Sequence, residues 1–292
     1  MPFLNYPKTS RYTPFMNRIL LNKIISEALA EDIGMGDLTT DSIFNDNDIG
    51  VGMFSAKADG VLAGLDCLAI AYETLGSSID IEFFKKDGDS VSKDEIIAKV
   101  KGSVKTLLSG ERVILNLIQH LSGIASSTYN VVSLLDDASI TITDTRKTLP
   151  GLRALQKYAV TCGGGKNHRF RLDDAVMIKD NHINAAGSIS KAVQLARSKV
   201  GHVVKIEVET ETKEQVLEAV NAGVDIIMLD NQSPDEVKKF VEIIPDNIII
   251  EVSGGITPNN IATYKGCGVG VISLGWLTHS VKALDISFNL KN

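Results

Sequence analysis

The sequence predicts an α/β fold built on a parallel sheet, and the prediction comes from the rhythm of its second half. Six short apolar runs alternate with helix-like stretches, and from the third run on the repeat is about twenty residues, the length of one βα unit. The runs are almost entirely apolar, as strands buried on both faces are. They are SITITDT, AVMIKD, VVKIEVE, DIIMLD, NIIIEV and GVISLG.

Polar residues follow these runs at their carboxyl ends, and this is the second observation. They are Arg146 and Lys147, then Lys179, Asp180 and Asn181, then Glu207 and Glu209, then Asp230 and Asn231, then Ser253, Gly254 and Gly255, and finally Gly275. Such placement is typical of an α/β-barrel active site, although a doubly wound sheet also holds its ligand there. No GxGxxG follows a first strand and no GxxxxGK[ST] occurs, so the dinucleotide and P-loop interpretations lack their motif.

Composition bounds the class of protein. The chain has 292 residues, 44% of them hydrophobic, which is enough for a substantial core in one large domain or two smaller ones. The net charge of -6 argues against a nucleic-acid-coating role. Cys67, Cys162 and Cys267 form no CxxC pair, which fits a reducing cytoplasm. No signal-peptide pattern or membrane-spanning apolar run occurs, so we expect a soluble, unexported protein.

The first half of the chain predicts a smaller α+β unit. Apolar residues recur at helical spacing over Phe15 to Glu31, and the charges between them are mixed, so this helix should pack on a core or a partner subunit. Residues 50 to 107 alternate short β-like runs with turns around one helical stretch, CLAIAYETL. Ser109 to Leu135 lacks proline and has apolar residues at helical spacing, which predicts a long helix.

The segment from Thr143 to His182 concentrates positive charge around a triple glycine, Gly163 to Gly165. In an acidic chain this pattern favours a discrete polyanionic ligand, because arginine binds carboxylate or phosphate with two hydrogen bonds and glycine turns present backbone N–H groups to anions. We therefore predict a cationic cradle built on turns. Its cations are Arg146, Lys147, Arg153, His168, Arg169 and Lys179.

Two consecutive glycine turns and two carboxylates complete the candidate site. Ser253-Gly254-Gly255 and, one βα unit later, Ser273-Leu274-Gly275 resemble the phosphate pocket that follows the final strands of barrels. Glu209 and Asp230 should project from neighbouring strand ends, where they can hold Mg²⁺ on phosphates, bind ribose hydroxyls or neutralise a developing cation. Glu207 has the same parity as Glu209, so alternation alone does not rank the two.

These motifs together closely resemble the quinolinate phosphoribosyltransferase family. The resemblance rests on TRKTLPGLRALQKYAVTCGGGKNHR, AVMIKDNHI, IEVET, IIMLDN, EVSGGI and LTHSVKALDISFNL, and it extends back to EDIGMGDLTT and GERVILNLIQHLSGIA. It implies an N-terminal α+β sandwich over residues 1–120, an incomplete seven-stranded α/β barrel over residues 121–280, and a C-terminal segment, residues 281–292, that returns to the first domain. It also implies a homodimer in which one domain caps the partner's barrel, and it leaves further assembly into hexamers open.

The resemblance implies a reaction and a set of residues. Quinolinate and phosphoribosyl pyrophosphate give nicotinate mononucleotide, pyrophosphate and CO₂, with Mg²⁺. The expected quinolinate ligands are Arg112, reaching across from the partner subunit, and Arg146, Lys147, His168, Arg169 and Lys179. The expected ligands of phosphoribosyl pyrophosphate are Lys147, Lys179, Glu209, Asp230, Ser253, Gly254, Gly255 and Gly275. The expected catalytic groups are Lys147, Lys179, Glu209 and Asp230, of which Glu209 and Asp230 hold Mg²⁺ directly or through the pyrophosphate.

Four residues depart from the family pattern: Thr161 precedes CGGG where arginine is common, Phe170-Arg171 replaces a small pair, and Trp276 replaces alanine. They bear on the shape of the pockets, and Trp276 is expected to fill core space. Two alternatives stay open. One is a related molybdenum-transport-type protein, which the complete set of anion ligands disfavours. The other is a Schiff-base barrel lyase using Lys179. A phosphate-binding module without activity would not need the carboxylates and the dicarboxylate clamp together.

Overall fold

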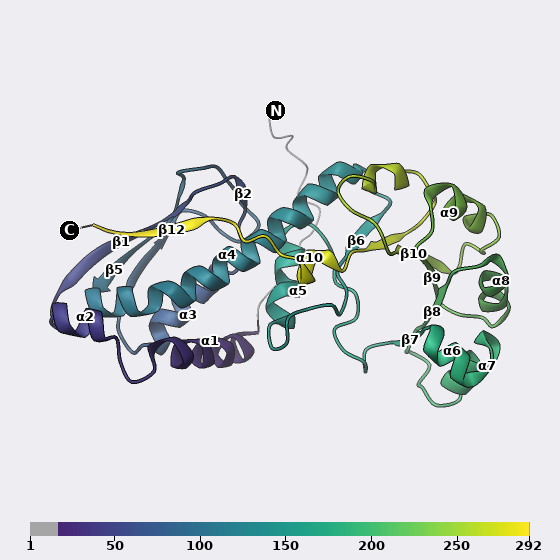
Figure 1. Cartoon of the computed structure of the whole chain (residues 1–292), viewed down its shortest axis with the longest axis horizontal. Coiled ribbons are helices and arrows are strands. Elements are labelled where there is room, and N and C mark those ends of the chain that lie inside the picture. The colour runs from purple at the N-terminus through teal and green to yellow at the C-terminus, as the bar shows by residue number, and fades with distance from the viewer. Residues whose placement is uncertain (1–16, 292) are drawn as a thin grey trace.

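The computed structural model describes residues 17–291, which form an antiparallel half and a parallel half connected by one long helix (Figure 1). The helix predicted from Phe15 is present as α1, Arg18–Ile33. Phe15 itself, with the rest of residues 1–16 and Asn292, lies outside the described residues. The side chain of Asn17 caps α1 by accepting hydrogen bonds from the N–H groups of Ile19 and Leu20.

The predicted α+β unit is confirmed. Its antiparallel sheet has the strand order β12-β1-β5-β3, and β2 pairs with β4 beside it. The strands are β1 (Ile49–Ala56), β2 (Gly60–Val61), β3 (Asp80–Phe83), β4 (Ser90–Val91), β5 (Ile96–Ser103) and β12 (Ile286–Lys291). The helices are α1, α2 (Leu38–Ile43) and α3 (Asp66–Thr74). Because β12 pairs with β1 along its whole length, the C-terminal segment lies in the N-terminal sheet, where the resemblance places it.

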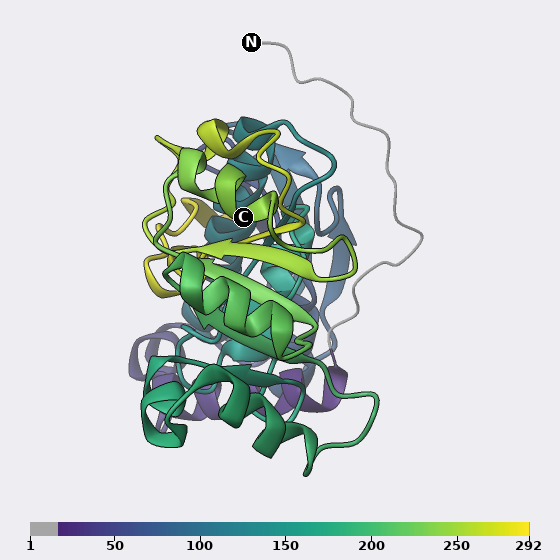
Figure 2. The ribbon, with the colours of Figure 1, turned by 90° about the vertical axis from the view of Figure 1, so that its right-hand side faces the viewer.

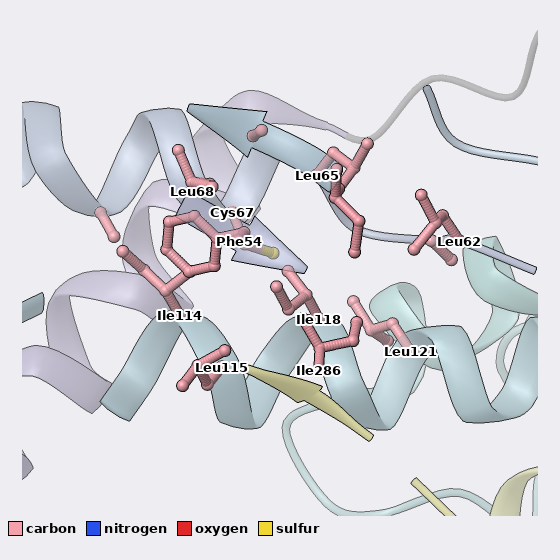
Figure 3. Close-up of a cluster of buried hydrophobic side chains, with 14 of the residues drawn as sticks. Phe54, Leu62, Leu65, Cys67, Leu68, Ile114, Leu115, Ile118, Leu121 and Ile286 are labelled. Carbon is pink, nitrogen blue, oxygen red and sulfur yellow. The ribbon is translucent and has the colours of Figure 1, made fainter. Parts of the chain in front are cut away.

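The long predicted helix is α4, Val104–Leu135, and it begins directly after β5 rather than at Ser109. The division expected between residues 120 and 121 falls inside this helix. Its first half closes an apolar core in which Phe54 of β1 packs near Ile114 and Ile118 (Figure 3). All three side chains are fully buried, so the core removes large apolar groups from water, which is the main stabilising term of folding.

The parallel half is an incomplete α/β barrel. Its sheet has six strands in the order β6-β11-β10-β9-β8-β7, and every neighbouring pair is parallel. They are β6 (Thr141–Thr143), β7 (Val176–Ile178), β8 (Ile206–Thr210), β9 (Ile226–Asp230), β10 (Ile249–Ser253) and β11 (Val271–Ser273). Seven strands were expected; within residues 17–291 the seventh is reduced to a single parallel bridge between Thr143 and Lys166, beyond β6.

Helices cover the outer face of this sheet, as Figure 2 shows for those between the central strands. The predicted stretches are α7 (Ile189–Arg197), α8 (Lys213–Asn221) and α9 (Pro234–Val241), and further helices are α5 (Arg153–Cys162), α6 (Asp180–Ala186), the 3-10 turn η1 (Ile261–Tyr264) and α10 (Trp276–His279). No helix in the described part of the chain is long and apolar enough to cross a membrane.

Candidate active site

The predicted polar residues gather at one edge of the parallel sheet. In the strand register Glu209 lies opposite Met228, Asp230 lies opposite Ser253, and Ser253 lies opposite Ser273. Lys147 follows β6, Lys179 follows β7, and Gly275 follows β11. Because carboxyl ends of parallel strands share an edge, the sequence-predicted residues of the barrel lie along one edge of the sheet.

Arg146 and Arg169 supply its positive charge. Burial first, and then the charge of Arg146, lowers the pKa of Arg169, so the two guanidinium groups lie close enough to repel each other. Nη1 of Arg169 donates to the carbonyl oxygen of Ala175 at 2.8 Å. The Nε atom of Arg146 is buried without a hydrogen-bond partner. A buried charged donor without a partner is costly, and an anionic ligand would relieve this cost.

Lys147 and Lys179 border the same site. The Lys147 carbonyl oxygen accepts from Oγ1 of Thr278 at 2.8 Å, while its side chain remains exposed. A Cβ atom on Gly275 would lie 2.8 Å from Cδ of Lys147, so glycine at this position leaves space for the aliphatic part of the lysine side chain. Nζ of Lys179 donates to Oε2 of Glu209 in an ion pair.

Glu209 and Asp230 lie close enough for their charges to interact. Burial first, and then the charge of Glu209, raises the pKa of Asp230. Nδ2 of Asn231 donates to Asp230 at 2.8 Å, and Gly254 packs on both residues, since a Cβ on it would lie 2.2 Å from Oδ1 of Asn231. The neighbouring carboxylates of Glu209 and Asp230 fit Mg²⁺, a cation that prefers carboxylate oxygens and the oxygens of a bound phosphate.

The two candidate phosphate turns are joined to each other. Oγ of Ser253 donates to the carbonyl oxygen of Ser273 at 3.4 Å, and Gly255 has a φ of +64°, a conformation that favours glycine. Nε1 of Trp276 donates to the carbonyl oxygen of Ile256 at 2.9 Å. Trp276 therefore connects the chain after β11 with the turn after β10, a role beyond the core filling expected of it.

The triple glycine does not form the predicted anion cradle, and that prediction is wrong. The N–H groups of Gly163, Gly164 and Gly165 donate to carbonyl oxygens of α5, at 3.1 to 3.2 Å, and so they end this helix. A Cβ on Gly163 would lie 2.3 Å from the carbonyl oxygen of Ala125 in α4. Gly163 and Gly165 leave room for the close approach of α4, whereas Gly164 has a φ of +90°, a conformation that favours glycine. The helix α5 itself replaces part of the predicted turns.

A buried ion pair that the sequence prediction missed lies behind the cations. Nζ of Lys157 contacts Oδ1 of Asp144, and neither side chain is exposed. Asp144 also accepts from Nδ2 of Asn167 at 2.6 Å and from the N–H of His168 at 2.9 Å. Burial raises the pKa of Asp144 and lowers that of Lys157. The ring of Phe170, a departure from the family pattern, lies 5.0 Å from Nζ of Lys157.

His168 faces a second pair of buried carboxylates. Its Nε2 lies 3.2 Å from Oε2 of Glu207 and 3.5 Å from Oε2 of Glu251, and its Nδ1 accepts from the N–H of Arg169 at 2.7 Å. Burial opposes a charged ring, yet the hydrogen bond to Glu207 and the charges of Glu251 and Glu207 together raise the pKa of His168. Burial and the charge of Glu207 raise the pKa of Glu251 to about 7.

The structure separates the two glutamates that the sequence left unranked. Glu209 lies at the strand end with Lys179, whereas Glu207 is 2% exposed and faces His168. Glu251 was not predicted, although a charged residue inside the apolar run NIIIEV is a signal for it. Lys157 carried no comparable signal, because it resembles an ordinary surface lysine of an amphipathic helix.

Arg112 does not join the other predicted residues within one chain. It lies on α4, in the antiparallel half, with its side chain 60% exposed and 4.0 Å from Glu111. Thr161 and Arg171 also stay outside the cation cluster: Oγ1 of Thr161 donates to the carbonyl oxygen of Tyr158, and Arg171 pairs with Asp173.

Comparisons with known proteins match both halves of this architecture. A family model for the N-terminal domain of quinolinate phosphoribosyl transferase matches residues 37–122, and one for its C-terminal domain matches residues 124–289. The chain is 52% identical to a probable nicotinate-nucleotide pyrophosphorylase [carboxylating] of Bacillus subtilis (strain 168), over 94% of this chain and 95% of the relative. NadC from Streptococcus pyogenes, whose crystal structure is known, is 41% identical to this chain in sequence. The two structures have a TM-score of 0.92, over 95% of this chain and 99% of that one. The nicotinate-nucleotide pyrophosphorylase from Francisella tularensis is 37% identical, with a TM-score of 0.91 over 97% of this chain and 100% of its own.

Proposed function

The chain belongs to the quinolinate phosphoribosyltransferase family, and from this premise we propose how its residues carry out the reaction. The protein is a carboxylating nicotinate-nucleotide pyrophosphorylase, a pentosyltransferase of NAD biosynthesis. It transfers the phosphoribosyl group of phosphoribosyl pyrophosphate to quinolinate, with release of pyrophosphate and CO₂.

Arg146 and Arg169 bind the two carboxylates of quinolinate. The observation that carries this assignment is the buried, unpartnered Nε of Arg146 beside a second guanidinium. Planar guanidinium groups match carboxylates with paired hydrogen bonds. Lys147 and Lys179 border the same space and contact carboxylate or pyrophosphate oxygens. His168 directly precedes Arg169, and its Nδ1 accepts the main-chain N–H of this arginine.

Phosphoribosyl pyrophosphate lies along the strand ends. Ser253, Gly254, Gly255 and Gly275 receive its 5′-phosphate, since two turns held together by Trp276 offer backbone N–H groups there. Glu209 and Asp230 bind the ribose hydroxyls and hold Mg²⁺, directly or through the pyrophosphate. The ion, when bound, neutralises charge on the leaving pyrophosphate.

The chemistry needs positioning and electrostatics rather than a protein nucleophile. The lone pair of the quinolinate ring nitrogen forms the bond to C1′, and pyrophosphate leaves with the electrons of the C1′–O bond. Glu209 and Asp230 stabilise the positive charge that develops on the ribose. The ring cation then accepts the electrons of the C2–carboxylate bond as CO₂ leaves, and a proton replaces it at C2. Lys147 and Lys179 hold the two substrates in register for the first step.

The complete site requires a second copy of the chain. Arg112 is exposed on α4 and distant from the other ligands, which supports a homodimer in which Arg112 of one subunit reaches the barrel of the other. The three cysteines are free, which suits work in a reducing cytoplasm.

The alternative functions are not favoured. A Schiff-base lyase needs a neutral lysine, whereas Lys179 is held in an ion pair by Glu209. A molybdenum-transport-type relative would not be expected to keep the complete set of anion ligands.

The test is turnover of purified protein with Mg²⁺, phosphoribosyl pyrophosphate and carboxyl-labelled quinolinate, with nicotinate as a parallel substrate. We expect labelled CO₂ and nicotinate mononucleotide from quinolinate alone, and loss of both on chelation of the metal. Product from nicotinate at an equal rate would contradict the assignment of the site to a dicarboxylate. Full activity after chelation would contradict the proposed role of Mg²⁺.

A further inference from the structure

Glu207 and Glu251 are two buried carboxylates for which the reaction described above has no use. They lie on β8 and β10, on either side of β9, and are 2% and 3% exposed. The Oε1 atom of each is buried without a hydrogen-bond partner. A carboxylate in such a place is costly to keep, so a role for the pair must come from what its other oxygens contact.

Both Oε2 atoms face one group, the ring of His168, at 3.2 and 3.5 Å from Nε2. The other ring nitrogen, Nδ1, accepts the N–H of Arg169 at 2.7 Å. A nitrogen that accepts a hydrogen bond carries no hydrogen, so the ring hydrogen lies on Nε2, pointing at the carboxylates. The two glutamates therefore fix the tautomer that lets Nδ1 hold the main chain of Arg169.

The main chain of His168 is fixed by the second buried pair. Asp144 accepts its N–H and Lys157 donates to its carbonyl oxygen, both at 2.9 Å. Ring and backbone of His168 are thus held on all sides by protein groups. No ring donor is left for a substrate carboxylate, whereas Arg169, the next residue, carries its guanidinium toward that of Arg146.

A metal ion is the competing explanation for this cluster. Ligand atoms of His168, Glu207 and Glu251 all lie within 4.8 Å of one another. A neutral imidazole that binds a metal through Nε2 carries its hydrogen on Nδ1. That hydrogen would point at the N–H of Arg169, 2.7 Å away, so the observed contact favours the hydrogen-bonded arrangement.

We propose that Glu207 and Glu251 are positioning residues for quinolinate binding: they hold the Nε2–H tautomer of His168, whose Nδ1 fixes the backbone that presents Arg169 to the substrate. The inference rests on the assignment of Arg169 to quinolinate. It makes His168 a part of the frame rather than a direct ligand of the substrate.

The first test reads the tautomer in the unmodified protein. Long-range proton–nitrogen NMR of wild-type protein labelled with ¹⁵N histidine, with the signal of His168 assigned from its absence in His168→Gln, should show hydrogen on Nε2 and none on Nδ1. A ring with hydrogen on Nδ1 at neutral pH overturns the proposal. So does metal at one equivalent per chain in protein purified without chelator. Because this measurement does not depend on turnover, it stays readable if the quinolinate reaction itself fails.

The second test uses two amides that mimic different ring nitrogens. His168→Asn places an amide group near the position of Nδ1, where it can accept the N–H of Arg169. His168→Gln extends its amide toward the position of Nε2 and loses the acceptor at Nδ1. We expect the KM for quinolinate to rise about tenfold in His168→Gln and in Glu207→Gln but only about threefold in His168→Asn, the scale of one or two hydrogen bonds. The KM for phosphoribosyl pyrophosphate should change less than about twofold, since the groups that contact His168 are Asp144, Lys157, Arg169, Glu207 and Glu251, and none of them is assigned to this substrate. Equal effects of His168→Asn and His168→Gln would contradict the proposal. Equal rises in the KM values for quinolinate and for phosphoribosyl pyrophosphate would also contradict it.

Discussion

The two halves of the molecule bury different kinds of side chain. In the antiparallel half, the buried polar residues among residues 17–291 carry only hydroxyl groups, such as Thr106 and Ser122. The parallel half buries four charged residues: Asp144, Lys157, Glu207 and Glu251. Both halves have a large apolar core, so packing alone does not require these charges.

The difference indicates where stability has been exchanged for function. Buried ion pairs add little net stability, because desolvation of the charges offsets their attraction. All four buried charges lie against His168, next to the proposed quinolinate ligands. We conclude that the antiparallel half is built for stability and that the barrel keeps costly charges to position its site.

Breaking the buried pair should have the largest effect. Lys157→Ala leaves Asp144 buried without its cation, and we expect a loss of about 3–5 kcal/mol in the free energy of unfolding. The matched control, Lys57→Ala in the antiparallel half, breaks the exposed 3.6 Å pair with Asp94 and should cost less than about 1 kcal/mol. Urea unfolding of both variants measures the contrast, and equal losses would contradict it.

Removing an exposed cation of the barrel should lower activity and leave the free energy of unfolding almost unchanged. Lys147→Ala removes a lysine that borders both proposed substrates, so kcat/KM should fall about a hundredfold or more while unfolding stays within about 0.5 kcal/mol of wild type. Lys239→Ala, at the exposed end of α9, is the control and should change neither quantity. Wild-type turnover in Lys147→Ala with normal binding of both substrates would remove the role given to this lysine.

The sequence predicts the fold and the edge of the sheet where the site lies, because the apolar runs and the residues that end them are local signals. It does not predict the buried charged residues that lie behind that edge. Gly163 to Gly165 looked like an anion-binding turn, and only the approach of α4 reveals them as a helix end. Lys157 owes its environment to elements distant in the chain, so no local pattern shows that it is buried. The apolar run around Glu251 indicates burial, but it does not show that this carboxylate faces His168.

The smallest effect is expected at the junction of the phosphate turns. Trp276→Phe keeps an aromatic ring but loses the 2.9 Å hydrogen bond to Ile256. The KM for phosphoribosyl pyrophosphate should rise about fivefold, as loss of one hydrogen bond worth about 1 kcal/mol implies, and that for quinolinate should not change. Because Trp276 is the only tryptophan in the sequence, its fluorescence in the wild type should respond to this substrate and not to quinolinate. A response to quinolinate alone would contradict this role.

The pKa of Glu251 allows a direct test of the exchange of stability for function. Burial, and then the charge of Glu207, raises its pKa in the folded protein from an ordinary value of 4.5 to about 7. A raised folded pKa gives stability that is complete below the unfolded pKa and is lost as the pH rises through the folded value. Between pH 4 and pH 8 this carboxyl group should therefore cost the wild type about 3 kcal/mol, a cost that Glu251→Gln avoids.

The decisive measurement is the free energy of unfolding of Glu251→Gln and wild type at pH 8, made beside kcat/KM for quinolinate on the same samples. We predict that the variant is the more stable protein by up to about 3 kcal/mol and the poorer enzyme by about tenfold. A variant that is less stable, or one that keeps the full kcat/KM, would show that the charges of the barrel are not kept for its site.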